Sequence, residues 1–399
     1  MIQTYIYATI MIIILIRLFM KKTNIMGRVL WILFTIISVF SVIAMKAGLV
    51  ESNVTLFPYL FLIVVYLIAF YPFITEKGRF SVEKVTYNLN IKYVIFAYVF
   101  IIAGIISIMY YLPVVRQLMI SGEWNQNRSD LYSGAFHLSY TWYQYFALQF
   151  VGYTEILGII VGFTLLRNEQ KSILGWLSII VGSLASVLSA MSQSSRGAIV
   201  NIVLLVLTIF FFFYRELANN KKRLILIFVL AGIISMLPYV IEVTVSRFST
   251  TGASDSIISY FGQPPVVFNY GVTPVYKHMY GLYAWGNLFG ASPVSPSDIG
   301  GSWGTGFYSF VGWMYIDWGY IGTIIVSIII AYLTYCIIAK ETYDIADLFL
   351  IFFIYYTLLQ GVFVIGRDYC YNMFMTLMIY GFIKIFFDKY TFVVGSIKL

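Results

Sequence analysis

Long apolar runs separated by short polar turns make up most of the chain. A helix needs about 20 consecutive apolar residues to cross the hydrocarbon core of a bilayer. Eleven stretches satisfy this requirement, and we predict spans at residues 4–20, 29–47, 55–74, 93–112, 142–166, 173–191, 197–214, 224–243, 319–338, 346–365 and 372–388. The pattern therefore predicts an all-α polytopic membrane protein, with residues 1–399 forming a single membrane domain.

Residues 244–306 break this pattern, because they are rich in Ser, Gly, Pro, Tyr and Trp. An irregular backbone cannot lie against lipid, since hydrocarbon offers it no hydrogen-bond partner. The segment is also more aromatic than a disordered linker. We therefore predict a folded large outer loop at residues 244–306, accompanied by a second, polar outer loop at residues 113–141.

Short helices are expected within the large loop. Ser254 followed by Asp255 is typical of a helix start, and Gly281 is placed to end the last short helix. Prolines favour the first turn of a helix, and three are placed to open short helices here: Pro264, Pro265 and Pro274.

The composition excludes a water-soluble globular protein, because 61% of residues are hydrophobic, 11% are charged and the mean hydropathy is +0.87. The net charge of +8 does not indicate nucleic-acid binding, since the basic residues are dispersed over short turns. When the turn at residues 21–28 is assigned to the cytoplasm, 18 of the 25 Lys and Arg residues fall inside. The positive-inside rule then places the N-terminus outside, the C-terminus in the cytoplasm and both long loops outside.

The arginines that remain on the outer side are the first candidates for chemistry. The planar fork of donors on a guanidinium suits phosphate, and four outer arginines are candidate diphosphate ligands: Arg128, Arg196, Arg247 and Arg367. The alternative is that each pairs with a carboxylate of an outer loop or with lipid headgroups.

Arg196 has the most specific setting of the four. It follows a polar turn that begins at Ser192, and the apolar run after Gly197 predicts a helix that starts here. The free N–H groups of a helix N-terminus attract an anion, and Arg196 would add a full positive charge. A tight turn capped by its own serines is the alternative.

Glu155 lies near the middle of the fifth predicted span. An ionisable residue at that depth is a candidate for function, and Glu155 is a candidate catalytic base. The alternative is a structural pair with a Gln, Tyr or Lys of a neighbouring helix.

His278 follows Pro274 in the large loop and is a second candidate base, because an imidazole can accept a proton from a hydroxyl. A histidine held by hydrogen bonds of the loop is the alternative. Asp255, Asp298 and Asp317 are further candidates for the base. The His, Asp and Glu residues lack metal-ligand spacing, so the sequence predicts neither a metal site nor a cofactor.

Aromatic residues of the large loop, with Tyr260 and Tyr270 as candidates, could contact a glycan, because their flat faces stack on sugar rings while their hydroxyls donate hydrogen bonds. The alternative is the aromatic belt that membrane proteins place at the lipid–water interface.

The layout of spans and loops resembles the Wzy-type polymerases, which assemble bacterial O-antigen or capsular polysaccharide from lipid-linked repeat units. The resemblance covers nearly the whole chain as architecture. It includes the large outer loop late in the chain, the turn from Ser194 to Gly197 that opens a span, the stretch from Tyr260 to Pro264, and Arg367 at the last outer turn.

This resemblance implies a metal-independent, GT-C-like integral membrane glycosyltransferase in the bacterial cytoplasmic membrane. It implies polyprenyl-diphosphate-linked oligosaccharide as substrate, outer arginines that bind the diphosphate, contact with membrane lipid, and flippase and chain-length regulator proteins as partners. The base stays open among Glu155, Asp255 and His278.

Two other functions stay open at the sequence level. The O-antigen ligases share the outline and would use the same donor, with His278 as the only match to a loop histidine. A flippase or transporter of lipid-linked oligosaccharide is the second, although it predicts short loops on both faces and charged residues along a central path.

Overall fold

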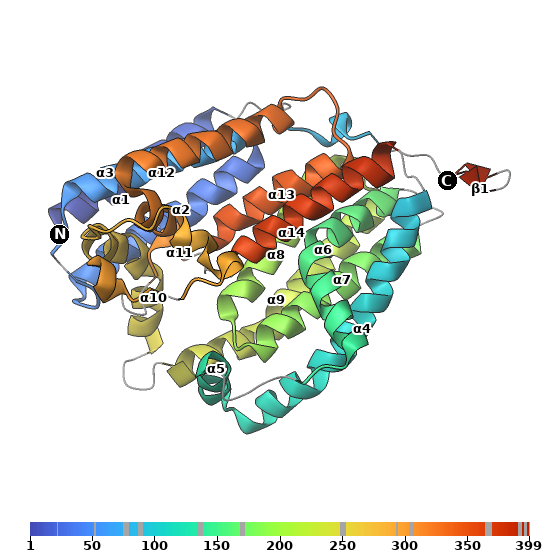
Figure 1. Cartoon of the computed structure of the whole chain (residues 1–399), viewed down its shortest axis with the longest axis horizontal. Helices are drawn as coiled ribbons and strands as arrows, with labels where there is room; N and C mark the ends of the chain where they lie inside the picture. Colours follow the sequence, from blue (N-terminus) through green and yellow to red (C-terminus); the bar gives the residue numbers. More distant parts are fainter. Residues whose placement is uncertain are drawn as a thin grey trace. The chain divides into compact units, whose positions relative to one another are not determined.

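The computed structural model of the chain describes residues 1–21, 23–51, 53–74, 80–86, 91–133, 139–167, 172–247, 253–292, 294–302, 307–363, 369–389, 393–394 and 397–398 (Figure 1). Among these residues, ten helices are long and apolar enough to cross a membrane, and an eleventh apolar helix is shorter. The chain is thus a helical, multi-pass membrane protein.

The helices have the following bounds: α1 (Ile2–Met20), α2 (Ile25–Lys46), α3 (Leu56–Phe70), α4 (Ile91–Ser121), α5 (Trp124–Ser133), α6 (Trp142–Arg167), α7 (Ser172–Ser192), α8 (Arg196–Phe213), α9 (Asn219–Arg247), α10 (Ala253–Val267), α11 (Leu282–Trp285), α12 (Ser309–Ile338), α13 (Ile345–Gln360) and α14 (Tyr369–Phe382). Short 3-10 or π segments are η1 (Tyr71–Phe73), η2 (Val82–Lys84), η4 (Tyr214–Glu216), η5 (Phe268–Val272), η6 (Gly286–Phe289), η7 (Pro296–Ile299) and η8 (Ile383–Lys389). Strands β1 (Val393–Val394) and β2 (Ile397–Lys398) pair antiparallel near the C-terminus.

The described residues form two compact units. Unit 1 comprises residues 1–81, 250–340 and 354–374, and unit 2 comprises residues 82–249, 341–353 and 375–399. Each unit is built from segments far apart in the sequence, so neither could be recognised as a continuous stretch of chain.

Unit 1 packs α1, α2, α3, α10 and α12 around an aromatic centre. The ring of Phe34 lies 4.6 Å from that of Tyr66 and 5.0 Å from that of Phe70, and Phe310 contacts the same group. Helix α10 lies close against α2, since a Cβ at Gly262 would be 2.6 Å from both the main-chain oxygen of Phe40 and Cβ of Ala44. Glycine at position 262 thus permits the large loop to pack on a span.

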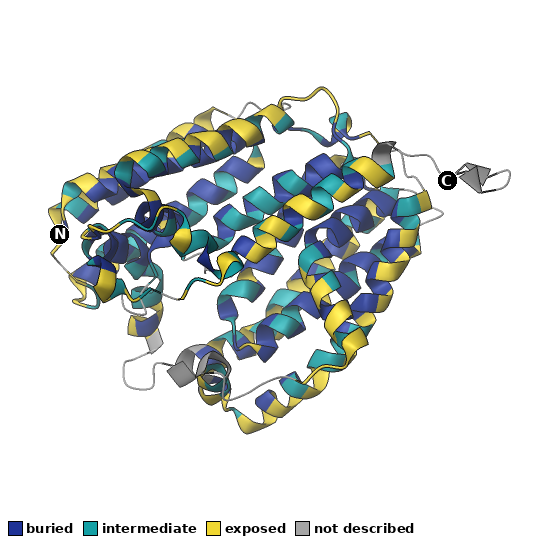
Figure 2. Ribbon diagram, viewed as in Figure 1, coloured by how far each residue is buried: buried dark blue, intermediate teal, exposed yellow. Residues whose placement is uncertain are grey.

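Unit 2 is organised around α4, α6 and α7, which pack on one another (Figure 1). The ring of Phe100 on α4 fits against two glycines: a Cβ at Gly158 would lie 2.3 Å from it and a Cβ at Gly182 would lie 2.9 Å from it. Small residues let helices approach closely where lipid provides no hydrophobic driving force. The opposite face of α4 carries exposed apolar side chains suited to lipid (Figure 2).

The eleven predicted spans each correspond to a helix, but several boundaries differ by four residues or more. Helix α4 continues nine residues beyond the predicted end, to Ser121, with Pro113 in its interior. Helix α12 begins at Ser309 rather than at residue 319, and α13 ends at Gln360, making it the shorter apolar helix. Both predicted outer loops therefore begin within a helix, since residue 113 lies in α4 and residue 244 lies in α9.

The expected helix signals of the large loop are partly right. Helix α10 begins at Ala253, within one residue of the predicted start, but Pro264 and Pro265 lie inside it and do not open helices. Pro274 follows the π-helix η5 without opening a helix, and Gly281 precedes α11 with φ of 92° instead of ending a helix. For Pro264 and Pro265 the prediction was wrong because the packing of α10 against α2 outweighs their first-turn propensity.

Candidate functional site

The turn between α7 and α8 in unit 2 brings the first candidates together. The N–H of Ser194 donates to the main-chain oxygen of Met191 at 2.9 Å, and the N–H of Ser195 donates to that of Ala190 at 2.8 Å. These two bonds form a Schellman motif, which requires a left-handed residue after the helix. Ser194 takes that place with φ of 52°, although glycine would do so without strain. Backbone strain of this kind is often found at functional sites.

Helix α8 starts directly after this turn, at Arg196. The predicted helix start is therefore confirmed, and the alternative of a serine cap is not, because the side chain of Ser195 makes no capping hydrogen bond. The N-terminus of α8 carries the partial positive charge of the helix dipole. Arg196 is only 8% exposed, so a guanidinium is buried where the helix dipole already favours an anion.

Helix α5 covers the turn and supplies a second arginine. The Nδ2 of Asn127 donates to the main-chain oxygen of Ser192 at 2.9 Å and to Oγ of Ser194 at 3.2 Å. The next residue, Arg128, donates from Nη1 to the main-chain oxygen of Ser194 at 3.5 Å. Arg128 and Arg196 are therefore brought to one turn of unit 2.

Helix α5 holds this position for local reasons. Gly122 ends α4 with φ of 68°, and the N–H of Trp124 donates to the Gly122 oxygen at 2.9 Å, so the chain reverses between α4 and α5. Trp124 is fully buried and packs edge-on against the ring of Tyr239 on α9, with centroids 4.9 Å apart. A buried tryptophan contributes roughly 2 to 3 kcal/mol through burial, which fixes α5 on α9.

Glu155 on α6 lies beside Ser186 of α7. Its Oε1 atom is buried and makes no hydrogen bond among the described residues. Six residues separate Ser186 from Ser192, which places Glu155 about 9 Å along the α7 axis from the turn that carries Arg196. The alternative for Glu155 was a structural pair with a Gln, Tyr or Lys. The partner is instead Ser186, and a serine is a weaker partner for a buried carboxylate.

The other candidate arginines cannot be placed in this site. The side chain of Arg247 lies outside the described residues, although the residue itself ends α9, and Arg367 lies wholly outside them.

Candidates in the large loop belong to unit 1. Asp255 is exposed in the first turn of α10. Tyr260 packs against the rings of Phe307 and Phe363, with centroids 4.9 and 4.8 Å away, so this tyrosine has a packing role. Tyr270 is half-buried in η5, and burial, followed by the nearby charge of Glu51, raises the pKa of its hydroxyl.

His278 packs edge-on against Tyr315 of α12, with ring centroids 5.5 Å apart. Its Nδ1 atom is buried and makes no hydrogen bond among the described residues. The Nδ1 atom therefore gives no support, among the described residues, to the alternative of a histidine held by loop hydrogen bonds. Asp317, another candidate base, is fully buried and accepts two backbone hydrogen bonds, so its carboxylate is already engaged.

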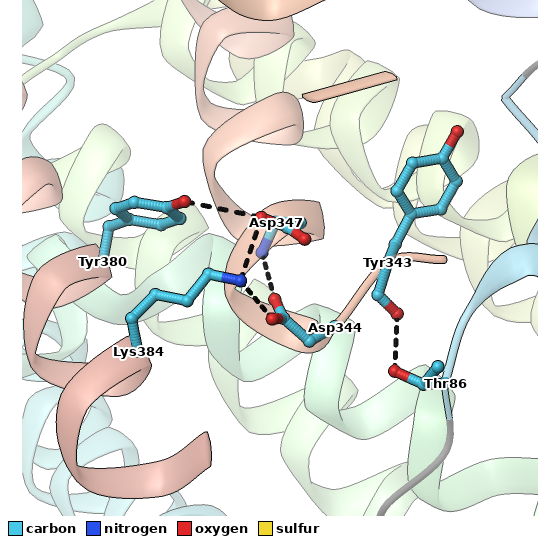
Figure 3. A network of polar contacts seen from close by, with 6 residues as sticks. All are labelled: Thr86, Tyr343, Asp344, Asp347, Tyr380 and Lys384. Carbon is cyan, nitrogen blue, oxygen red and sulfur yellow. Dashed lines mark hydrogen bonds and ion pairs between the residues drawn. The ribbon is translucent and has the colours of Figure 1, made fainter. Parts of the chain in front are cut away.

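A separate polar cluster in unit 2 joins the start of α13 to the end of α14 (Figure 3). Lys384 forms ion pairs with Asp344 and, at 3.1 Å, with Asp347, which also accepts from the Tyr380 hydroxyl at 3.4 Å. Asp344 in turn accepts from the N–H of Asp347 at 2.8 Å and so caps α13.

This cluster lies far from the Arg196 turn. Lys92, near the start of α4, donates to the main-chain oxygen of Phe386, which follows Lys384 in η8. The α5 turn follows the other end of α4, and a helix of 31 residues is about 46 Å long. The cluster therefore anchors helix ends and is not part of the candidate site.

The sequence did not indicate the roles of Asn127 and Ser186. Both act through contacts with distant parts of the chain, Asn127 across 65 residues to Ser192. The polar residues around Asn127 predict an exposed segment, but they do not indicate that this segment covers the turn between α7 and α8.

No protein-family model, curated protein or solved structure matches this chain at a significant level. The case for a function rests on the geometry and on the sequence pattern.

Proposed function

We propose that the chain is a GT-C-like integral membrane glycosyltransferase that polymerises polyprenyl-diphosphate-linked oligosaccharide repeat units. The products would be O-antigen or capsular polysaccharide, made at the outer face of a bacterial cytoplasmic membrane. The N-terminus is then outside and the C-terminus in the cytoplasm, with flippase and chain-length regulator proteins acting beside the enzyme.

The buried arginine at the start of α8 is the observation that carries this proposal. Arg196 is 8% exposed, begins a helix whose N-cap residue, Ser195, makes no side-chain capping hydrogen bond, and shares its turn with Arg128. A diphosphate headgroup would match two guanidinium groups and a helix N-terminus in both charge and geometry.

The reaction forms one glycosidic bond and breaks the bond between the anomeric carbon of the donor glycan and the diphosphate oxygen. A hydroxyl of the acceptor repeat unit attacks the anomeric carbon of the growing glycan, and the carbon–oxygen bond to the diphosphate breaks. The electron pair goes to the departing polyprenyl diphosphate, whose increased negative charge Arg196 and Arg128 stabilise. Without a metal, arginines are the strongest electrostatic catalysts available to such a site.

The proton of the acceptor hydroxyl needs a base. Glu155 is the candidate that belongs to the same unit as the arginine turn, and its buried Oε1, which makes no hydrogen bond among the described residues, is well placed to accept a proton. Asp255 is the weaker candidate because water screens an exposed carboxylate. His278 is the alternative in unit 1. Arg247 and Arg367 remain proposed ligands of the diphosphate, and Tyr270 remains a proposed glycan contact.

A cellular experiment tests the proposal. Cells that depend on this chain for surface glycan receive Arg196→Ala, with Arg116→Ala as a matched control because Arg116 is an exposed arginine of α4. We expect Arg196→Ala to abolish long glycan chains at unchanged protein level, whereas Arg116→Ala leaves them intact. Normal chain length with Arg196→Ala would remove the arginine from the site and take the main support from the proposal.

A further inference from the structure

Helix α12 is broken about three turns after its buried beginning, at Gly319. Gly319 has φ of 63° and ψ of −166°, a conformation that no residue with a Cβ adopts without strain. A break of this kind frees main-chain oxygens that an unbroken helix would use in its own ladder. The oxygens of Ile316 and Asp317, just before the break, accept hydrogen bonds from another segment.

That segment is residues 278–284, called here the docked segment. The N–H of Met279 donates to the Ile316 oxygen at 3.1 Å, and the N–H of Tyr280 donates to the Asp317 oxygen at 2.9 Å. Tyr280 has φ of 51°, so the chain is forced into a left-handed turn at this contact.

The carboxylate of Asp317 completes the attachment. Its Oδ1 accepts from the N–H of Tyr283 at 2.8 Å and its Oδ2 accepts from the N–H of Ala284 at 2.9 Å. Asp317 is fully buried, and hydrogen bonds to an ionised acceptor are stronger than those between neutral groups. Both oxygens are thus used to bind the backbone of the docked segment.

The same break makes room for His278. A Cβ at position 319 would lie 2.8 Å from Nε2 of His278 and 3.2 Å from its Cε1. The imidazole therefore lies directly over the glycine, with Tyr315 against its edge. Because Nδ1 makes no hydrogen bond among the described residues, packing and the attached backbone orient the ring.

We infer that Asp317 is a positioning residue, which fixes the docked segment on the Gly319 break and thereby sets the place of the His278 imidazole. This role rests on the proposed function, in which His278 is a candidate for the proton acceptor. It differs from the earlier expectation for Asp317, because a carboxylate with both oxygens bound to backbone N–H groups holds the segment and does not receive the substrate proton.

The first test measures attachment without reference to activity. Hydrogen exchange of the full-length protein in detergent, read on peptides covering residues 278–285, reports the amides of Tyr283 and Ala284. In the wild type we expect slow exchange, and with Asp317→Asn an increase of roughly tenfold or more, since an amide side chain can accept only one of the two bonds. Asp298→Asn, which alters an exposed carboxylate of η7, should leave the exchange unchanged.

The second test reads the imidazole directly. The chain has two histidines, so a His137→Gln background leaves His278 as the only one that diethyl pyrocarbonate can modify. We expect slow modification in this background and roughly tenfold faster modification when Asp317→Asn is added. Gly319→Ala should give the same result by pushing against the ring while Asp317 stays intact.

The outcomes are separable. Unchanged exchange and unchanged modification with Asp317→Asn would overturn the positioning role. Faster exchange and modification at full polymerase activity would also overturn it, because the place of the imidazole would then not matter to the reaction. If the variants do not accumulate, rapid exchange of the two amides in the wild type would contradict the attachment. Full activity with Arg196→Ala would instead defeat the proposed function and leave the attachment standing.

Discussion

The side-chain amide of Asn127 on α5 donates a 2.9 Å hydrogen bond to the main-chain oxygen of Ser192, the last residue of α7. The same amide donates to Oγ of Ser194, the strained residue of the turn. One side chain thus joins α5, which carries Arg128, to the turn that carries Arg196. This contact adds to the packing of Trp124 in holding the two arginines at one turn.

Asn127→Ala should therefore reduce glycan polymerisation without unfolding the protein. A hydrogen bond of this kind is worth about 1 kcal/mol, so we expect a decrease of about fivefold to tenfold in polymer yield. Gln126→Ala is the matched control, because Gln126 is exposed and its side-chain amide donates within α5, to Asp130. Equal activity of the two variants would show that α5 need not be fixed to the turn.

Glu155→Gln tests the proposed base. The substitution keeps the size of the side chain but removes its ability to accept a proton, and loss of a general base typically costs on the order of 10² to 10⁴ in rate. We expect the purified variant to lose polymerisation by at least about a hundredfold while its thermal unfolding stays close to that of the wild type. Glu123→Gln, at an exposed carboxylate of unit 2, should remain active. Full activity of Glu155→Gln would return Glu155 to a structural role.

The packing of α4, α6 and α7 provides a prediction for stability. Gly158→Ala places a methyl group 2.3 Å from the Phe100 ring, so the helices must separate, at a cost of about 1 to 3 kcal/mol. Gly152 lies on the same helix with no atom within 4 Å of its Cβ position, and Gly152→Ala should be neutral or stabilise by up to about 1 kcal/mol. Thermal unfolding in detergent measures both variants, and equal stability would contradict the close approach of these helices.

The spans could be predicted from the sequence because membrane thickness sets a length that apolar runs must satisfy. All eleven predicted spans correspond to helices, and the start of α8 at Arg196 is confirmed. Helix α4 runs past Pro113 to Ser121 because packing of its end residues Val115 and Leu118 continues the buried face. A prediction based on average hydropathy ends this span earlier, where the polar residues begin.

The candidate site could be predicted only in part. Arg196 and Glu155 violate the apolar pattern of the chain and are conspicuous for that reason. The contacts of Asn127 with Ser192, and of Asp317 with Tyr283, join residues 65 and 34 positions apart, and no local pattern reports such contacts. The break at Gly319 also gives no sequence signal, because a glycine within an apolar run is ordinary in membrane helices.

The chain-length distribution that the purified protein makes from a lipid-linked repeat unit alone shows whether the protein polymerises glycan. We expect a ladder of products with the wild type, and no ladder with Arg196→Ala at equal protein concentration. A wild-type protein that makes no ladder, or that transfers glycan only after a second acceptor is added, would contradict the assignment as a polymerase.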